Sequence, residues 1–476
     1  MIRTRYAPSP TGYMHVGNLR TALYEYLIAK HYGGRFILRI EDTDQNRQVE
    51  GSVGAIYNAL KAAGLQHDEG PGVGGPYGPY VQSARKGIYQ KYAKELAEKG
   101  RAYYCFCDKE RLNAFNEHDK YDRHCLGMPA GEVQAKLASN APYVIRQLIP
   151  EGETRFLDLV YGDITISNDQ LDDQVLIKSD GMPTYNFANV IDDHLMLITH
   201  VIRGNEYISS TPKYNLLYDA LGWQIPAYIH VPLIVNAKGE KLAKRKGDAT
   251  FEDLLSQGFL PEAVVNFIAL LGWSPADNTE VFSLAELVEA FDENRINKSP
   301  SVFDLQKLTW MNSEHIKRMD PERFFEMSLP VLKSSVQTPG IDLRSIAPMV
   351  QTRINFIHEI PSLVDFIDEL PDYDIELFVH KKMKTNVEIS LSSLKQALPV
   401  LTGLGLWDLP GIHDALSGLV TSLGIKNGQM LWPVRTALSG KPTSPCGAAE
   451  LCALLGKEES LKRIRLGIEK LESKKA

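Results

Sequence analysis

Apolar and polar residues mix in a short segment near the start of the chain and then give way to apolar residues at helical spacing. The segment 2–7 is a candidate for a short strand, and the Pro- and Gly-rich segment 8–12 ends it. One apolar stripe then follows at helical spacing, through Leu19, Ala22, Leu23, Tyr26 and Leu27. The pattern therefore predicts a strand, a turn and an amphipathic helix in that order.

The same order repeats further along the chain. A second predicted strand, 36–40, ends at the acidic segment 41–44, and a second helical stripe runs through Val53, Ile56, Tyr57 and Leu60. Alternating strands and helices favour a parallel sheet, which binds ligands at the carboxyl ends of its strands. From residue 311 onward the pattern is mostly helical. We therefore expect an α/β region followed by an all-helical one.

The length of the chain, 476 residues, requires more than one hydrophobic core. A segment dense in Gly and Pro, 70–80, marks the first predicted boundary. We expect four parts: an α/β half, a mixed insertion, a second α/β half, and a helical region that divides again near residue 370. Their predicted ranges are 1–80, 81–186, 187–310 and 311–476.

The composition is that of an ordinary globular protein, with 44% hydrophobic and 23% charged residues. A formal net charge of −7 argues against a protein coated with nucleic acid, but an RNA-binding enzyme depends on where its basic residues lie. The chain start lacks the apolar core of a signal peptide, and no segment is apolar enough to span a membrane. Five cysteines do not suggest a disulfide framework, so we expect a cytoplasmic protein without membrane contact.

The turn between the first predicted strand and helix is the first candidate for chemistry. Gly12 and Gly17 would let a ligand approach the backbone, and the helix start would offer free N–H groups to a phosphate. His15 could donate a hydrogen bond to a phosphate oxygen as charge develops there. The alternative is an ordinary Pro- and Gly-rich turn with an exposed histidine.

A cationic segment, 240–247, is the second candidate, and its basic residues are Lys241, Lys244, Arg245 and Lys246. Such a loop can clamp a triphosphate and neutralise the pyrophosphate that leaves. The alternative is a solvated basic turn or a patch that contacts RNA.

In their order along the chain these two segments resemble the paired signatures of class I aminoacyl-tRNA synthetases. The segment 15–18 resembles the HIGH motif, with Asn18 in place of the final histidine, and 241–245 resembles KMSKS. Its third position is Ala243, where the family usually has serine, but both lysines remain. Each signature alone is weak, whereas the ordered pair is specific.

Further segments narrow the resemblance to bacterial-type glutamyl-tRNA synthetases. The resemblance implies a Rossmann-type catalytic domain, an insertion that binds the acceptor end of tRNA, and a helical anticodon-binding region. It also implies ATP with Mg²⁺, glutamate and tRNA(Glu) as partners, and a monomer. The matching segments keep the family's order over essentially the whole chain: 3–12, 36–44, 79–83, 178–185, 189–194, 201–204, 302–305, 310–312 and 433–440.

The same resemblance implies roles for individual residues. Arg5 matches the residue that recognises the glutamate side chain, Arg203 a second pocket arginine, and Glu41 the residue that receives the α-ammonium. Arginine suits carboxylates because of its planar fork. Taken singly, each residue could be an ordinary strand-end polar group. The other implied pocket residues are Ala7, Ser9, Tyr185 and Asn189; the implied catalytic residues are His15, Lys241 and Lys244; and ATP is implied to contact Gly12, His15, Gly17, Asn18 and Lys244.

Three cysteines, Cys105, Cys107 and Cys125, are close enough in sequence to suit tetrahedral zinc. The family, and a shorter relative that modifies a tRNA base, sometimes bind zinc at such a Cys-x-Cys pair. The fourth ligand is Tyr121 by spacing or His124 by chemistry. Reduced free cysteines are the alternative.

The implied reaction has two steps. The α-carboxylate of glutamate attacks the α-phosphate of ATP, which gives glutamyl-adenylate and pyrophosphate, and a terminal hydroxyl of tRNA then attacks the acyl carbon. Positioning and charge stabilisation are the implied means of catalysis. Three alternatives stay open: the short relative, which lacks a C-terminal anticodon region, a glutaminyl enzyme with C-terminal β-barrels, and an inactive RNA-binding paralogue.

In the helical region, the segment 353–361 resembles the part of the family that reads the first anticodon base. The side chain of Arg353 could hydrogen-bond to a splayed base and stack on it, as is usual for single-stranded RNA loops. The alternative is a surface arginine paired with an acid.

Overall fold

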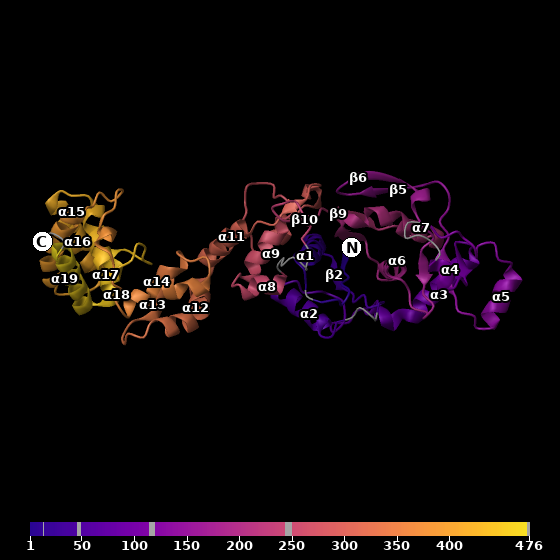
Figure 1. Ribbon diagram of the computed structural model, residues 1–476, viewed down its shortest axis with the longest axis horizontal. Coiled ribbons are helices and arrows are strands. Elements are labelled where there is room, and N and C mark those ends of the chain that lie inside the picture. The colour runs from indigo at the N-terminus through magenta and orange to yellow at the C-terminus, as the bar shows by residue number, and fades with distance from the viewer. Residues whose placement is uncertain (13, 45–48, 114–119, 243–249, 474–476) are drawn as a thin grey trace. The chain divides into compact units, whose positions relative to one another are not determined.

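The computed structural model describes residues 1–12, 14–44, 49–113, 120–242 and 250–473. The chain divides into two compact units, Met1–Leu308 and Thr309–Ala476, which we describe separately (Figure 1). Among the described residues, no helix combines the length and the apolar character needed to cross a membrane.

A parallel strand pair opens the first unit, as the sequence predicts. Strand β1 (Arg3–Tyr6) pairs with β2 (Arg35–Leu38), and helix α1 (Val16–His31) connects them. Helix α1 buries Leu19, Ala22, Leu23 and Leu27 of the predicted stripe and leaves Tyr26 half-buried, and it also packs against helices α9 and α10. The second predicted helix is α2 (Ser52–Ala62), which buries Ile56 and Leu60 but leaves Val53 37% exposed.

A four-stranded sheet, in the order β6-β5-β9-β8, continues this layer. Strands β8 and β9 are parallel, and Arg203 of β8 is the register partner of His230 in β9. The amide of Thr199, directly before β8, donates to the carbonyl of Arg3 at 2.9 Å, so β8 begins beside β1. The strands are β5 (Glu153–Asp158), β6 (Gly162–Ser167), β8 (His200–Gly204) and β9 (Ala227–Val231).

An antiparallel sheet, β3-β4-β7, forms the centre of the inserted region. It shares one hydrophobic core with helices α3, α6 and α7, to which Tyr89, Leu176 and Phe187 belong. The elements of the region are α3 (Lys86–Glu98), β3 (Ala102–Cys105), α4 (Lys109–Asn113), α5 (Ala130–Ala138), β4 (Val144–Gln147) and β7 (Val175–Ile177). Helices α6 (Tyr185–Leu195) and α7 (Thr211–Leu221) follow it in the chain.

The first unit ends in short helices and a small parallel strand pair. Helix α9 begins with a proline at its first position, where the missing N–H costs nothing. These elements are β10 (Ile234–Val235), α8 (Phe251–Ser256), α9 (Pro261–Ala269), α10 (Leu284–Ala290) and β11 (Ser301–Val302).

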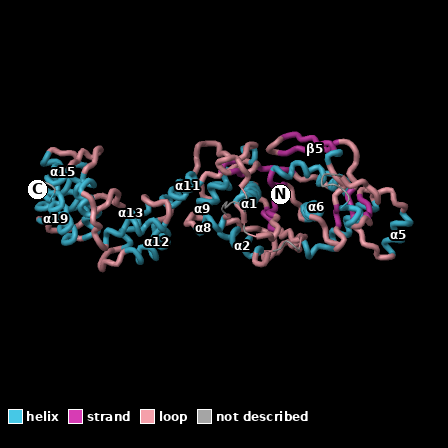
Figure 2. Tube along the Cα trace, in the orientation of Figure 1, coloured by secondary structure: helices cyan, strands magenta, loops and turns pink. Residues whose placement is uncertain are grey.

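The described part of the second unit contains helices and loops, and Figure 2 shows no strand there. Helix α12 packs against α13 and α14, while α15 packs against α17 and α19. The helices are α11 (Leu305–Arg318, which contains the boundary), α12 (Pro321–Ser335), α13 (Leu343–Gln351), α14 (Ile360–Val364), α15 (Val387–Thr402), α16 (Leu409–Leu423), α17 (Asn427–Ser439), α18 (Ala448–Leu455) and α19 (Lys457–Ser473).

Candidate active site

A pocket of about 450 Å³ opens where strands β1, β8 and β9 end. Parallel sheets bind ligands at this edge, as the order of elements predicts. Among the residues implied by the resemblance, the pocket is lined by Arg5, Ala7, Ser9, His15, Gly17, Asn18, Tyr185, Arg203 and Lys241. Gly12, Glu41 and Asn189 are not among its lining residues, and Lys244 and Ala243 lie outside the described residues.

The start of helix α1 forms one wall of the pocket. His15 caps this helix, and its Nδ1 accepts a hydrogen bond from the backbone N–H of Gly17 at 3.2 Å. Because Nδ1 accepts, a neutral imidazole carries its proton on Nε2. The wall thus combines a helix N-terminus with an imidazole donor, which is a combination suited to phosphate oxygens.

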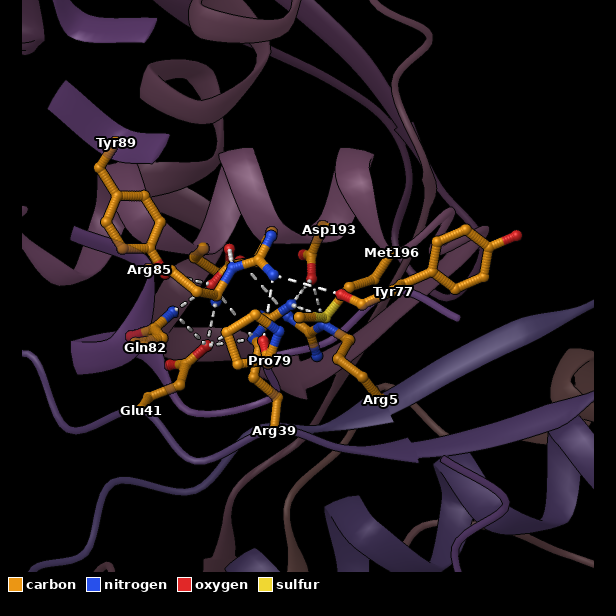
Figure 3. Close-up of polar contacts among 12 residues, drawn as sticks. Arg5, Arg39, Glu41, Tyr77, Pro79, Gln82, Arg85, Tyr89, Asp193 and Met196 are labelled. Atoms are coloured by element: carbon orange, nitrogen blue, oxygen red, sulfur yellow. Dashed lines mark hydrogen bonds and ion pairs between the residues drawn. The ribbon is translucent and has the colours of Figure 1, made fainter. Parts of the chain in front are cut away.

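Arg5 lies on the opposite side, at the end of β1, and is 4% exposed. Its Nε donates to Asp193 at 3.0 Å, and its Nη1 donates to Glu25 at 3.1 Å. Arg39 donates to the same oxygen of Asp193 at 2.7 Å, so two arginines share this carboxylate (Figure 3). Burial opposes the charge of Arg5, but Asp193 and Glu25 raise its pKa above the usual value.

Glu41 is connected to Arg5 through an amide. Asn189 accepts from Nη2 of Arg5 at 3.5 Å and donates to Oε1 of Glu41 at 3.3 Å. Arg39 also donates to Oε1 of Glu41, at 2.8 Å, while Oε2 of Glu41 is buried and has no hydrogen-bond partner among the described residues. Burial raises the pKa of Glu41 to about 7 in spite of the neighbouring arginines. The unsatisfied oxygen is an acceptor for a cationic ligand group that reaches it.

Helix α6 places three of these side chains on one face. Tyr185, Asn189 and Asp193 follow each other at a spacing of four residues, which is the spacing of neighbours on a helix surface. Burial, followed by the charge of Glu41, raises the pKa of Tyr185, which keeps this phenol protonated. The neighbouring residue, Asp192, accepts from Arg85 at 2.7 Å and from the hydroxyl of Tyr89 in helix α3 at 2.8 Å, and so anchors α6 to helix α3.

Arg203 is 7% exposed and forms no ion pair with any described carboxylate. Its guanidinium lies 4.4 Å from the ring centroid of Tyr214, and Tyr207 and Tyr228 complete an aromatic cage. A buried cation without a counter-charge is costly, so a site of this kind favours an anionic ligand.

A buried histidine holds Arg203 in place. Nδ1 of His230 lies 2.7 Å from Asp158, and its Nε2 accepts from Nε of Arg203 at 3.3 Å. Asp158 therefore fixes the tautomer that leaves Nε2 free to accept. Burial lowers the pKa of His230, although Asp158 opposes the shift. The sequence pattern does not single out His230 or Asp158, because both are interior positions of ordinary strands.

Lys241 stands at the rim of the pocket, where it is exposed and lies 3.4 Å from Glu206. Solvent screens such a pair, so it holds the lysine weakly. Lys241 can therefore exchange this partner for a phosphate.

The cysteine cluster lies in the inserted region, apart from the pocket. The sulfurs of Cys105, Cys107 and Cys125 are all within 4.8 Å of one another, and those of Cys107 and Cys125 are 3.6 Å apart. Tetrahedral zinc with bonds of about 2.3 Å would separate its sulfur ligands by about 3.8 Å. The Tyr121 hydroxyl lies 3.2 Å from two of the sulfurs, whereas His124 is exposed and is not part of this group.

The electrostatics of the cluster favour a thiolate at one position. Burial opposes ionisation of Cys105, but hydrogen bonds that involve Tyr121, the backbone and Arg146 lower its pKa overall. Burial raises the pKa of Cys107 to about 11, and the neighbouring thiols contribute to the shift. A cation among the three sulfurs would remove this opposition to ionisation. The donor set therefore fits zinc.

In the second unit, Arg353 lies in the turn that follows helix α13 and is exposed. It forms no ion pair with any carboxylate in the part of the unit that the structure describes, whereas the surface arginine Arg344 pairs with Glu322. A stacked pair of rings, Phe356 and His358, follows it with centroids 5.0 Å apart.

Family models match both parts of the chain. Residues 1–310 match the catalytic domain of class I tRNA synthetases (E and Q), and residues 323–468 match an anticodon binding domain.

Individual proteins are similar over the whole chain. A glutamate–tRNA ligase of Clostridium novyi is 59% identical over 99% of this chain and 98% of its own length. One from Lachnoclostridium phytofermentans is 60% identical over 99% of both chains. A crystal structure of a glutamate tRNA ligase from Elizabethkingia meningosepticum, in complex with its amino acid, is 35% identical with a TM-score of 0.85 and covers 99% of both chains.

Proposed function

The chain belongs to the class I tRNA synthetases for glutamate and glutamine, and on this premise we propose that it ligates L-glutamate to tRNA(Glu) with ATP. The observation that carries the proposal is the pair of buried arginines, Arg5 and Arg203, in a pocket at the carboxyl ends of parallel strands. Glutamate has two carboxylates, and arginine binds carboxylates through its planar fork.

The helical second unit decides between the alternatives left open by the sequence. A short relative has no anticodon-binding region, whereas residues 323–468 match one. A glutaminyl enzyme would have β-barrels here, whereas the described elements are helical. Relatives named glutamate–tRNA ligase at high identity argue against an inactive paralogue.

Residues in the pocket and directly beside it are proposed to recognise glutamate. Arg5 receives the side-chain carboxylate, and Arg203, held by His230, supplies the uncompensated positive charge. Glu41 receives the α-ammonium, for which its unpartnered oxygen and its link through Asn189 are suited. Ala7 and Ser9 line the wall, and Tyr185 closes it from helix α6; these six assignments rest on the resemblance and on the geometry together.

ATP binds in the pocket against the wall that the start of helix α1 forms. His15, Gly17 and Asn18 face the pocket there, and Gly12 supplies the turn before them with a φ of +127° that favours glycine. Mg²⁺ accompanies the triphosphate and neutralises its charge. Lys241 at the rim of the pocket stabilises the charge that grows on the phosphates. Lys244, which lies outside the described residues, has the same role in the proposal on the strength of the resemblance.

The reaction then needs positioning and charge stabilisation and no covalent nucleophile. Arg5 and Arg203 hold glutamate so that its α-carboxylate faces the α-phosphate, and the imidazole of His15 donates its Nε2–H toward a phosphate oxygen. The adenylate is next attacked by the terminal hydroxyl of tRNA, which the inserted region, 81–186, would bring to the pocket.

Zinc is proposed as a structural ion of the inserted region. Cys105, Cys107 and Cys125 would hold it, and Tyr121 is the fourth ligand that the geometry favours over His124. The backbone N–H of Phe106 donates to the sulfur of Cys125 at 3.4 Å, which is the kind of contact that orients a metal ligand. The ion would fix the strand β3 and the loop around Tyr121.

The second unit would recognise the anticodon, with Arg353 as the reader of one base. We expect the enzyme to act in the cytoplasm and to be a monomer; light scattering of the purified protein would check the oligomeric state.

One assay tests the proposed function. Purified tRNA(Glu) should accept radioactive glutamate in the presence of ATP and Mg²⁺, and ATP–pyrophosphate exchange should depend on glutamate. Glutamine in place of glutamate is the control, and a tRNA(Gln) transcript shows whether that tRNA is charged as well. Charging with glutamine, or no charging with either amino acid, contradicts the proposal.

A further inference from the structure

Glu25 is a charged residue inside the pocket for which no role has been assigned. It lies in the middle of helix α1, has no exposed surface, and lines the pocket beside Arg5. Its Oε1 accepts from Arg5 at 3.1 Å, whereas its Oε2 is buried and finds no hydrogen-bond partner in the part of the chain that the structure describes. Buried carboxylate oxygens are nearly always satisfied, so this one calls for an explanation.

The charges around Arg5 provide the explanation. Arg5 donates to Glu25 through Nη1 and to Asp193 through Nε, so ionised Glu25 would place two carboxylates on one guanidinium. Arg39 compensates part of the charge of Asp193, but it does not contact Glu25 in the hydrogen bonds and ion pairs of the described residues. With Glu25 ionised, little positive charge at Arg5 is left for a ligand carboxylate.

The other elements packed on α1 supply few groups that compensate Glu25. Strand β1 adds Tyr6, whose pKa burial and Glu25 raise, and β8 adds Arg203 in the same pocket. The acids of α9 and α10 are Glu262, which is half-buried, and Glu286 and Glu289, which are exposed. Burial raises the pKa of Glu25 well above its usual value, in spite of the opposing charges of Arg5 and Arg39.

We propose that Glu25 is a positioning residue that must be neutral when glutamate binds, so that Arg5 keeps its positive charge for the side-chain carboxylate of the substrate. The proposal rests on the proposed function, because it takes Arg5 as the receiver of that carboxylate. The proton comes from solvent and joins a carboxylate oxygen of Glu25; no other bond changes.

Two consequences follow for binding. Glutamate affinity falls as pH rises through the titration of Glu25, because ionised Glu25 neutralises Arg5 and repels the incoming carboxylate. Glutamine carries a neutral amide and does not need that charge, so its binding changes less. Glu25 therefore contributes to the preference for the acid over the amide.

Calorimetric titration of the full-length protein with glutamate, from about pH 6 to about pH 8.5, tests the proposal. The dissociation constant of the wild type should rise with pH, by up to about tenfold per unit above the titration of Glu25. Glu25→Gln should lack this rise and keep only the opposite dependence of Glu41, whose carboxylate ionises around a pKa of about 7 and then binds the α-ammonium better. The ratio of the two dissociation constants, wild type over Glu25→Gln, should therefore rise with pH, and Glu25→Gln should bind glutamate more tightly than the wild type at the upper end. Glu289→Gln, an exposed acid of α10, is the matched control and should follow the wild type. Coincident profiles of wild type and Glu25→Gln, or weaker binding by Glu25→Gln at every pH, overturn the proposal.

Two further measurements keep the test decisive. If Glu25→Gln does not fold, the wild type alone can test the proposal. Calorimetric titrations in buffers of different ionisation enthalpy give the number of protons that the protein takes up when glutamate binds. A positive count at the upper end of the pH range supports the proposal, and a count of zero throughout overturns it. Wild-type charging of tRNA(Glu) at saturating glutamate is measured in parallel, so that a failure of the proposed function is seen separately.

Discussion

Arg203→Met offers the sharpest test of the pocket, because Arg203 and Arg5 differ in their partners. Arg5 contacts two buried acids, Glu25 and Asp193, whereas Arg203 contacts aromatic rings, His230 and a hydroxyl. Methionine keeps the length and the apolar volume of the side chain but removes its charge. The two arginines should therefore respond differently to the same substitution.

The expected magnitudes follow from these contacts. Losing one partner of a buried charge pair costs about 2–5 kcal/mol, so the dissociation constant for glutamate should rise about 30-fold or more in Arg203→Met. The free energy of unfolding should change by less than about 2 kcal/mol, because no buried carboxylate loses its partner. In Arg5→Met the buried pair with the ionised Asp193 is broken, and unfolding should become easier by about 3–5 kcal/mol.

Urea unfolding gives the stabilities, and calorimetric titration with glutamate gives the affinities of both variants. ATP binding, followed separately, should be kept in Arg203→Met and shows that the pocket is intact. Glutamate affinity within threefold of the wild type would remove Arg203 from the recognition of glutamate. Equal destabilisation by both substitutions would mean that Arg203 serves the fold and is not an unpaired charge held for a ligand.

Three further predictions concern other parts of the chain. Lys244→Ala should slow adenylate formation on the order of 100-fold while glutamate affinity stays similar, because its charge acts in the transition state; single-turnover kinetics checks this, and an unchanged rate contradicts it. Protein purified without chelator should contain one zinc per chain, and Cys125→Ser should lose it while Cys446→Ser keeps it; equal metal content in both variants refutes the site. Arg353→Gln should change about tenfold the ratio in which transcripts that differ only at the first anticodon base are charged, and an unaltered ratio excludes Arg353 as the reader.

The fold was accessible from the sequence because its strongest signals are local. The stripe through Leu19, Leu23 and Leu27 predicts helix α1, and its order with the flanking runs predicts the parallel pair β1 and β2. The extent of burial was not predictable, because α1 packs against β1, β2, α9 and α10 at once. A residue such as Glu25 has the polarity of a surface position, and only the second layer of packing makes it an interior one.

The site was accessible in part, through the resemblance. It indicated Arg5, Arg203 and His15, and the structure brings all three to one pocket. The residues that hold them, such as His230, lie on other strands, and the sequence around each of them contains no motif that marks it as functional. Their roles depend on register, in which Arg203 lies opposite His230, and register is a property of the paired strands.

Helix α6 belongs both to the amino-acid site and to the core of the inserted region, which limits how the chain can be shortened. One of its faces carries Asn189 and Asp193, and another contributes Phe187 and Ile191 to the core of the inserted region. Asp192 adds contacts to Arg85 and Tyr89 of the same region. The insertion is therefore no removable module: a shortened enzyme without it would expose an apolar flank of the helix that shapes the amino-acid site. We therefore expect substitutions in the outer loops of this region to be tolerated. Substitutions in the core that packs against α6 should also change how the amino acid is bound.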